Sequence, residues 1–278
     1  MLRLNNPLSR IALALIFVSC FSMCKKHMAD ISPDDMIEIE QPDLIGVTKQ
    51  INDAFGGYYI SLPKHYSETK KTYPVLIFLH GLGQTGSGDS TDLTYLLNDG
   101  IGKVLDKKKF PPNFTVDGKT SSFIVVSPQF SVEPSNRQMV EMMTYIMTTY
   151  RGDQKRLYIS GLSLGARLTT LMAGTYAKDF AAIVPISGVA VNPGIADRCK
   201  VIAENNLPVW AFHNQDDPLA NLDDASNFIN LIKGFNPPIM PRITIFNVYG
   251  HDAWTTALNP DYKENGKNMY EWMLQYSR

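Results

Sequence analysis

Apolar residues occur along this chain in short uninterrupted runs, separated by longer helix-like stretches. The clearest run covers residues 73–80 (YPVLIFLH) and ends at a cluster of glycines. A continuous run of this kind is typical of a strand that is buried on both faces of a parallel sheet. One alternating segment and five further runs predict the other strands, at residues 57–62, 123–127, 156–160, 182–186, 209–213 and 242–248.

The stretches between these runs predict helices. They lie at residues 136–150, 164–176, 225–233 and 267–275. Strands that alternate with helices favour a parallel sheet covered by helices on both faces. The pattern therefore predicts the α/β class, with a mostly parallel central sheet.

The first residues have the features of an export signal. A positively charged start precedes an apolar run at residues 11–18, which is too short to cross a bilayer. The residues that end at Cys20 are similar to the lipobox of bacterial lipoproteins, with Cys24 as the alternative lipidation site. We expect residues 1–24 to be a signal peptide of the lipoprotein type. The alternatives are a plain secretion signal that is cut nearby and an N-terminal anchor that stays attached.

The remaining chain divides by texture. Residues 25–50 are polar and acidic without a sustained period, and they predict a tether with a first turn or an edge strand. Residues 51–278 are expected to form one catalytic domain. The three cysteines exclude a disulfide scaffold, so Cys199 is expected to be a buried thiol.

Composition narrows the classes of function. Apolar residues make up 44% of the 278 residues and charged residues 19%, as in ordinary packed globules. The net charge of −1 gives no overall field for binding nucleic acid or an anionic membrane. No metal-ligand spacing stands out, so we expect neither a metal nor a cofactor.

A G-x-S-x-G motif, residues 161–165, lies between the strand predicted at 156–160 and the helix predicted at 164–176. Such a turn exposes its serine, here Ser163, while the glycines allow close approach of neighbouring backbone. The N-terminus of the helix supplies free N–H groups for a developing oxyanion. The alternative is a glycine-rich turn whose serine caps the helix.

A serine nucleophile needs a base, and hydrolases with this elbow place the base last in the chain order Ser, acid, His. Of the five histidines, only His213 and His251 follow Ser163. His251 comes just after the last predicted strand and is the expected base. His213 ends a predicted strand, and we expect it to have a structural role there.

The acid is expected in the loop after the strand at 209–213. Asp217 stands just before a proline and is our candidate, while Asp216 is the alternative. Asp252 is adjacent to His251, so its carboxylate would have difficulty folding back onto the imidazole.

The glycine cluster after the first buried strand predicts half of an oxyanion hole. In this class of hydrolase the backbone N–H groups of Leu82 and Leu164 would hold the oxyanion. His80 is expected to be a core histidine that bonds loop backbone. Residues 81–86 also fit the G-x-G-x-x-G dinucleotide fingerprint, with Asp99 as a ribose contact, but the residues that follow are a poor helix start.

Taken together, these segments resemble the α/β-hydrolase fold. More narrowly, they are similar to exported esterases and predicted peptidases related to polyhydroxybutyrate depolymerases and to feruloyl or acetylxylan esterases. The resemblance covers about residues 57–275 and implies Ser163, Asp217 and His251 as a catalytic triad. It depends on the segments YPVLIFLHGLG, FIVVSPQF, RLYISGLSLGA, FAAIVPISG, PVWAFHNQDDP and GHDAW.

Two departures from the family pattern are visible. Members commonly carry glycine where this chain has Ala166 and Asn214. Neither change removes a reacting group, but Ala166 is expected to alter how the helix packs under the pocket.

Three residues are candidates for contacts with substrate. Gln129 and Phe130 follow a predicted strand, and Trp254 lies just past His251. Packing in the core or at the rim is the alternative for each of them. Residues 98–121 are expected to be a cap loop or a long surface connection.

The expected function is a serine hydrolase that cleaves carboxylic esters through an acyl-enzyme. Acetyl or feruloyl esters of carbohydrates are implied only by the resemblance. The alternatives are a peptidase of prolyl-oligopeptidase type and a catalytically silent envelope binding protein. Expected partners are small-molecule or polysaccharide-linked esters, without nucleic acid, and with a membrane only through the N-terminal lipid anchor.

Overall fold

The computed structural model describes residues 32–191 and 193–278, so the predicted export signal, Cys20 and Cys24 lie outside the described residues. The chain divides into two units, Met1–Ile37 and Glu38–Arg278. The described part of the first unit contains a short 3-10 helix, η1 (Pro33–Asp35). No helix within the described ranges is long and apolar enough to span a bilayer.

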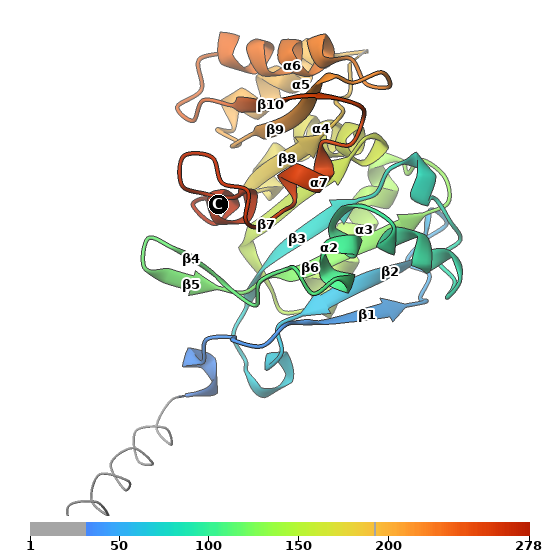
Figure 1. Cartoon of the computed structure of the whole chain (residues 1–278), viewed down its shortest axis with the longest axis vertical. Helices are drawn as coiled ribbons and strands as arrows, with labels where there is room; N and C mark the ends of the chain where they lie inside the picture. The colour runs from blue at the N-terminus through green and yellow to red at the C-terminus, as the bar shows by residue number, and fades with distance from the viewer. Residues whose placement is uncertain (1–31, 192) are drawn as a thin grey trace, which may run out of the picture. The chain divides into compact units, whose positions relative to one another are not determined.

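Eight strands form the central sheet of the second unit, in the order β1-β2-β6-β3-β7-β8-β9-β10 (Figure 1). The two pairs at the β1 end are antiparallel and the other five pairs are parallel. The strands are β1 (Asp43–Val47), β2 (Phe55–Leu62), β3 (Tyr73–Leu79), β6 (Ile124–Phe130), β7 (Gly152–Leu162), β8 (Ala182–Ile186), β9 (Trp210–Asp216) and β10 (Arg242–Tyr249). The predicted mostly parallel sheet is therefore confirmed.

Helices cover both faces of this sheet. One face packs against α3 (Asn136–Thr149), α4 (Leu164–Tyr176), α5 (Ile195–Glu204) and α6 (Leu222–Gly234). The other face packs against α2 (Gly100–Asp106), α7 (Trp254–Ala257) and α8 (Met269–Met273). Short 3-10 helices occupy several connections: η2 (Tyr66–Glu68), η3 (Leu82–Gln84), η4 (Asp92–Leu97) and η5 (Ala177–Asp179).

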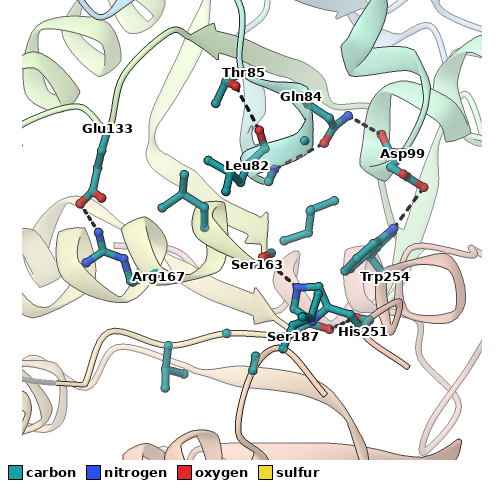
Figure 2. Close-up of a pocket in the computed structure, with 18 of the residues that line it drawn as sticks. Leu82, Gln84, Thr85, Asp99, Glu133, Ser163, Arg167, Ser187, His251 and Trp254 are labelled. Carbon is teal, nitrogen blue, oxygen red and sulfur yellow. Dashed lines mark hydrogen bonds and ion pairs between the residues drawn. The ribbon is translucent and has the colours of Figure 1, made fainter. Parts of the chain in front are cut away.

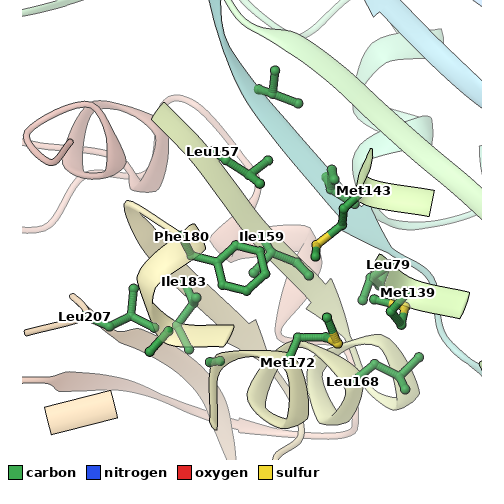
Figure 3. Close-up of a cluster of buried hydrophobic side chains, with 14 of the residues drawn as sticks. Leu79, Met139, Met143, Leu157, Ile159, Leu168, Met172, Phe180, Ile183 and Leu207 are labelled. Atoms are coloured by element: carbon green, nitrogen blue, oxygen red, sulfur yellow. The ribbon is translucent and has the colours of Figure 1, made fainter. Parts of the chain in front are cut away.

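The strand β3 shows why the sheet produces continuous apolar runs. Ile77 and Leu79 belong to the core on the α3–α6 face, whereas Leu76 and Phe78 belong to the core on the opposite face. Because side chains of a strand alternate between faces, a strand covered on both faces needs apolar residues at every position. Figure 3 shows the first of these cores, where strand side chains pack against methionines of α3 and α4 and against Leu168 of α4.

The folded unit starts earlier than the sequence texture indicated. The strand β1 lies within residues 25–50 and pairs with β2 from Asp43↔Leu62 to Val47↔Tyr58. It is an edge strand whose side chains are exposed or half-buried, so it lacks the apolar run that identified most of the other strands. The edge strand allowed within the tether is therefore present, and the domain boundary at residue 51 is too late.

Residues 98–121 are not a bare connection. They contain α2 and a hairpin of two three-residue strands, β4 (Phe114–Val116) and β5 (Lys119–Ser121). Phe110 and Phe114 are buried against Phe123 and Tyr270 in the second core. This segment therefore closes one face of the sheet.

Candidate active site

A strained turn joins β7 to α4 and carries Ser163 at its tip. Ser163 has φ 53° and ψ −113°, a backbone conformation that residues other than glycine rarely adopt. A Cβ at Gly165 would lie 2.0 Å from the carbonyl oxygen of Leu79, and one at Gly161 would lie 2.5 Å from Gly165. The glycines of the motif thus let the start of α4 come into direct contact with β3.

The side chain of Ser163 is hydrogen-bonded to a histidine from the loop after β10. Its Oγ lies 2.8 Å from Nε2 of His251 (Figure 2), and Nδ1 of the same ring lies 2.7 Å from Oδ2 of Asp217. An ionised carboxylate only accepts hydrogen bonds, so Nδ1 carries the ring proton. Nε2 is then free to accept the proton of the Ser163 hydroxyl.

The carboxylate of Asp217 is held in its charged form. Burial raises the pKa of Asp217, but hydrogen bonds from His251 and from the backbone outweigh that effect and keep the pKa below its ordinary value. The backbone donors are the N–H groups of Leu219 and Ala220, which lie 2.9 and 3.0 Å from Oδ1. The Asp217 side chain is fully buried, so this charge is shielded from solvent.

His213 lies directly behind this carboxylate and is 1% exposed. Its Nε2 donates to the carbonyl oxygen of Ala220 at 3.0 Å and lies 3.4 Å from Oδ2 of Asp217. This contact ties the end of β9 to the loop that carries Asp217, which confirms the predicted structural role.

The two other acidic candidates point elsewhere. Asp216 is exposed, and its backbone carbonyl accepts a hydrogen bond from Gly250. The carboxylate of Asp252 accepts from the N–H and the hydroxyl of Thr255, at 2.8 and 2.7 Å. Asp217 is therefore the carboxylate that contacts the imidazole of His251.

Two backbone donors begin helices beside Ser163. Leu82 is the first residue of η3 and Leu164 is the first residue of α4. The first N–H groups of a helix have no partner within the helix, so they are available to a ligand. The loop that carries Leu82 lies against the elbow, since a Cβ on Gly81 would come within 3.5 Å of the Ser163 Cβ.

His80 precedes that loop in the chain, bonds its backbone and is 1% exposed. Its Nδ1 donates to the carbonyl oxygen of Gly81 at 2.7 Å, and its Nε2 accepts from the N–H of Phe130 at 3.1 Å. Burial lowers the pKa of His80 to about 4, although the bond to Gly81 opposes the shift. The prediction of a core histidine that bonds loop backbone is confirmed.

The expectation that Gln129 and Phe130 line the cleft is wrong, because both are completely buried. The Gln129 amide donates to the carbonyl oxygens of Gln84 and Asp92 and accepts from Gly88. Phe130 stacks on His80 with ring centroids 3.7 Å apart. At the end of β6 the covering loop encloses both side chains, so they brace that loop.

A pocket of about 1020 Å³ opens at Ser163 and His251. Trp254 forms part of its wall, with its ring 5.3 Å from the His251 ring at 88° and its Nε1 donating to Asp99 at 3.3 Å. Across the pocket, Arg167 and Glu133 form an ion pair (Figure 2). Highly exposed leucines also belong to the pocket, namely Leu82 and Leu219.

The glycine cluster at residues 81–86 does not have a dinucleotide-binding context. It contains η3 and is followed by an irregular segment, and the next helix, η4, is a 3-10 helix of six residues. No α-helix therefore begins at the glycines to receive a pyrophosphate. Asp99 instead bonds Trp254. In the described part of the chain no group of histidine, cysteine and acidic side chains is arranged to hold a metal ion.

Sequence reasoning missed two residues that contact the His251 loop. Ser187 donates its hydroxyl to the carbonyl oxygen of His251 at 2.8 Å. Asn214 donates its amide to the carbonyl oxygen of Gly250 at 2.8 Å. Both stand where predicted parallel strands end, and carboxyl ends of such strands meet at one edge of the sheet. That shared position was the available signal.

Comparison with known proteins supports the fold, although no family model matches the sequence. A stretch of 144 residues is 34% identical to acetylxylan esterase A of Aspergillus awamori, covering 51% of this chain and 42% of that protein. The chain spans less than half the length of the curated relatives it matches.

Solved structures are similar over most of the chain. A ferulic acid esterase has a TM-score of 0.54 at 18% identity, covering 79% of this chain and 95% of that one. The feruloyl esterase module of Clostridium thermocellum, complexed with sinapinate, also has a TM-score of 0.54, at 15% identity, with coverages of 76% and 82%. With the sheet order described above, this similarity shows the α/β-hydrolase fold.

Proposed function

We propose that this chain hydrolyses carboxylic esters through an acyl-enzyme formed on Ser163. The observation that carries the proposal is the unbroken hydrogen-bond chain from Ser163 Oγ through His251 to Asp217, at 2.8 and 2.7 Å. A serine hydroxyl is a weak nucleophile, and it needs a base and a third group that orients the base. Each of the three groups has an atom at hydrogen-bonding distance from the next.

In the first half-reaction Nε2 of His251 takes the hydroxyl proton while Ser163 Oγ bonds to the ester carbonyl carbon. The carbonyl oxygen becomes an oxyanion, which the N–H groups of Leu82 and Leu164 stabilise, each contributing about 3 kcal/mol. The bond from the carbonyl carbon to the alcohol oxygen then breaks. His251 gives its proton to the departing alcohol, and Asp217 stabilises the imidazolium in between.

In the second half-reaction His251 takes a proton from water, and the water oxygen bonds to the acyl carbon. The same oxyanion forms and collapses, the bond to Ser163 Oγ breaks, and the proton on His251 returns to Ser163. The products are one carboxylic acid and the restored hydroxyl.

For the substrate, we propose acetyl or feruloyl esters of carbohydrates. Two observations support this choice: the names of the similar proteins, and the indole of Trp254 held beside His251. An aromatic wall next to the base suits a sugar ring or an aromatic acyl group. Export, and a lipid anchor on Cys20, stay predictions that mass analysis of the mature N-terminus tests.

The test uses short aryl esters and their amide analogues with the wild-type protein, Ser163→Ala and a control, Ser160→Ala. Ser160 is also buried, two residues before the end of β7, but its hydroxyl donates to the carbonyl oxygen of Val184. We expect Ser163→Ala to lower kcat/KM by more than ~10⁴-fold and the control to stay near wild type. Equal ester turnover by wild type and Ser163→Ala would overturn the proposal, and faster amide cleavage would favour a peptidase.

A further inference from the structure

Two buried or half-buried serines share a strained backbone conformation. Among the described residues seven non-glycine residues have positive φ, and five of these are exposed. The other two are Ser163 and Ser187, with φ 53° and 54°. They follow β7 and β8 directly, at the positions after the paired residues Leu162 and Ile186. Such strain persists only where the surroundings fix it, and it is a signal of function.

Ser187 is completely buried and has its hydrogen bonds to two other segments. Its N–H donates to the carbonyl oxygen of Phe212 in β9 at 2.9 Å. Its hydroxyl donates to the carbonyl oxygen of His251 at 2.8 Å, as Figure 2 shows. The strained backbone thus directs the hydroxyl of Ser187 at the main chain of the proposed base, and the reaction described above gives it no role.

Asn214 makes the corresponding contact from β9. It is 1% exposed, and its Nδ2 donates to the carbonyl oxygen of Gly250 at 2.8 Å, while its Oδ1 has no partner. Gly250 has φ 114°, and a Cβ there would meet nothing within 4 Å. No side chain packs against Gly250 on the side where a Cβ would point, so hydrogen bonds are what hold this point of the loop. A third bond runs from the Gly250 N–H to Asp216 at 3.1 Å.

We propose that Ser187 and Asn214 are positioning residues that fix the main chain at residues 250–251, and thereby the distance from His251 to Ser163. The inference rests on the proposed function and goes beyond it. Two consecutive carbonyl groups each accept a side-chain donor, one from Ser187 just after β8 and one from Asn214 in β9, so the loop cannot rotate without breaking one of these bonds. A misplacement of about 1 Å at a reacting group costs about a hundredfold in rate.

The test compares Ser187→Ala with Ser160→Ala. Both changes remove a buried hydroxyl that donates to a backbone carbonyl, at 2.8 and 2.6 Å, but only Ser187 reaches the His251 loop. The readouts are thermal unfolding, kcat and KM on an aryl acetate, and the rate at which a small fluorophosphonate labels Ser163. We expect kcat and labelling to fall about ten- to hundredfold for Ser187→Ala with KM nearly unchanged, and by less than about twofold for the control.

A second variant, Asn214→Leu, removes the other donor at similar volume, and it decides the question where Ser187→Ala does not fold. We expect the same fall in kcat and in labelling. A merely structural role predicts lower thermal stability with wild-type labelling for both variants, and that result would overturn this inference alone. Absence of labelling in the wild-type protein would overturn the proposed function, and this inference with it.

Discussion

Two histidines that each follow a strand at the same edge of the sheet differ in their hydrogen-bond partners and in their burial. His80 follows β3, and both of its ring nitrogens bond backbone, to Gly81 and to Phe130. His251 follows β10, and both of its ring nitrogens bond side chains, of Asp217 and Ser163. His80 is buried, while the side chain of His251 is 16% exposed at the pocket.

The difference shows what separates a supporting histidine from a proposed base. The burial that lowers the pKa of His80 to about 4 keeps its ring neutral at neutral pH. In the proposed mechanism, the negative charge of Asp217 beside His251 stabilises the imidazolium that forms when Nε2 takes a proton. The partners of the ring, and not its place after a strand, therefore determine its chemistry.

The largest expected effect comes from removing each ring in turn. We expect His251→Ala to lower kcat/KM on aryl esters about 10⁴- to 10⁶-fold with little loss of stability. For His80→Ala we expect the loss of stability to be the larger effect. Two backbone groups lose their partner, which costs about 1–3 kcal/mol for each group left unsatisfied. Ester kinetics and denaturant unfolding of both variants measure the contrast. Equal losses of activity would remove the distinction between the two rings.

The partner of His251 can be tested in the same way. We expect Asp217→Asn to lower kcat about 10³- to 10⁴-fold, because an amide cannot fix the tautomer or stabilise the imidazolium. The matched control is Asp216→Asn, which changes the neighbouring exposed carboxylate and is expected to stay near wild type. A larger loss for Asp216→Asn than for Asp217→Asn in steady-state assays would reassign the acid.

The buried ring of His80 predicts a pH dependence of stability. Its pKa is about 4 in the folded chain, against an ordinary value of 6.5. The unfolded chain therefore binds a proton between these values that the folded chain does not, so stability falls as pH drops from about 6.5 to 4, by up to about 3 kcal/mol. The lowered pKa of Asp217 makes stability depend on pH only below the ordinary value of 3.8, so it does not contribute to this change. Urea unfolding at several pH values measures this dependence. Between about pH 6.5 and 4, the free energy of unfolding should change less with pH in His80→Ala than in the wild type, and an equal change in both would contradict the prediction.

The smallest expected effect concerns the wall beside His251. We expect Trp254→Ala to raise KM for a feruloyl or sugar ester about tenfold, because the aromatic contact is lost. KM for a small aryl acetate should change by less than about threefold, since an acetyl group gains little from an aromatic wall. A ratio of kcat/KM for the two esters that does not change in the variant would show that Trp254 lies outside the substrate contacts.

The sequence predicted the strands that are buried on both faces, but it allowed the edge strand β1 only as one option within the tether and missed the β4–β5 hairpin. Residues 73–80 and 182–186 match β3 and β8 closely, because covering both faces requires continuous apolar residues. The edge strand β1 and the three-residue strands of the β4–β5 hairpin carry no such run. The helix α5, which buries Cys199, was also missed, although that thiol was correctly expected to be buried.

The candidate site was predictable where chemistry restricts the choice of residue. The glycine-flanked turn motif identified Ser163. Only two of the five histidines follow it in the chain, which led to His251. Gln129 was misplaced because strand periodicity does not tell which loop encloses a strand end. The contacts of Ser187 and Asn214 with residues 250–251 join segments far apart in sequence, and only the folded sheet edge brings them together.

The most direct test of the account is to trap the intermediate itself. Wild-type protein is mixed with an aryl acetate, quenched in acid within the first turnover, digested and sequenced by mass spectrometry. The account predicts an acetyl group on the peptide that contains Ser163, and on its hydroxyl. Sustained ester turnover with no acetyl group on Ser163, or with the acetyl group on another residue, would contradict it.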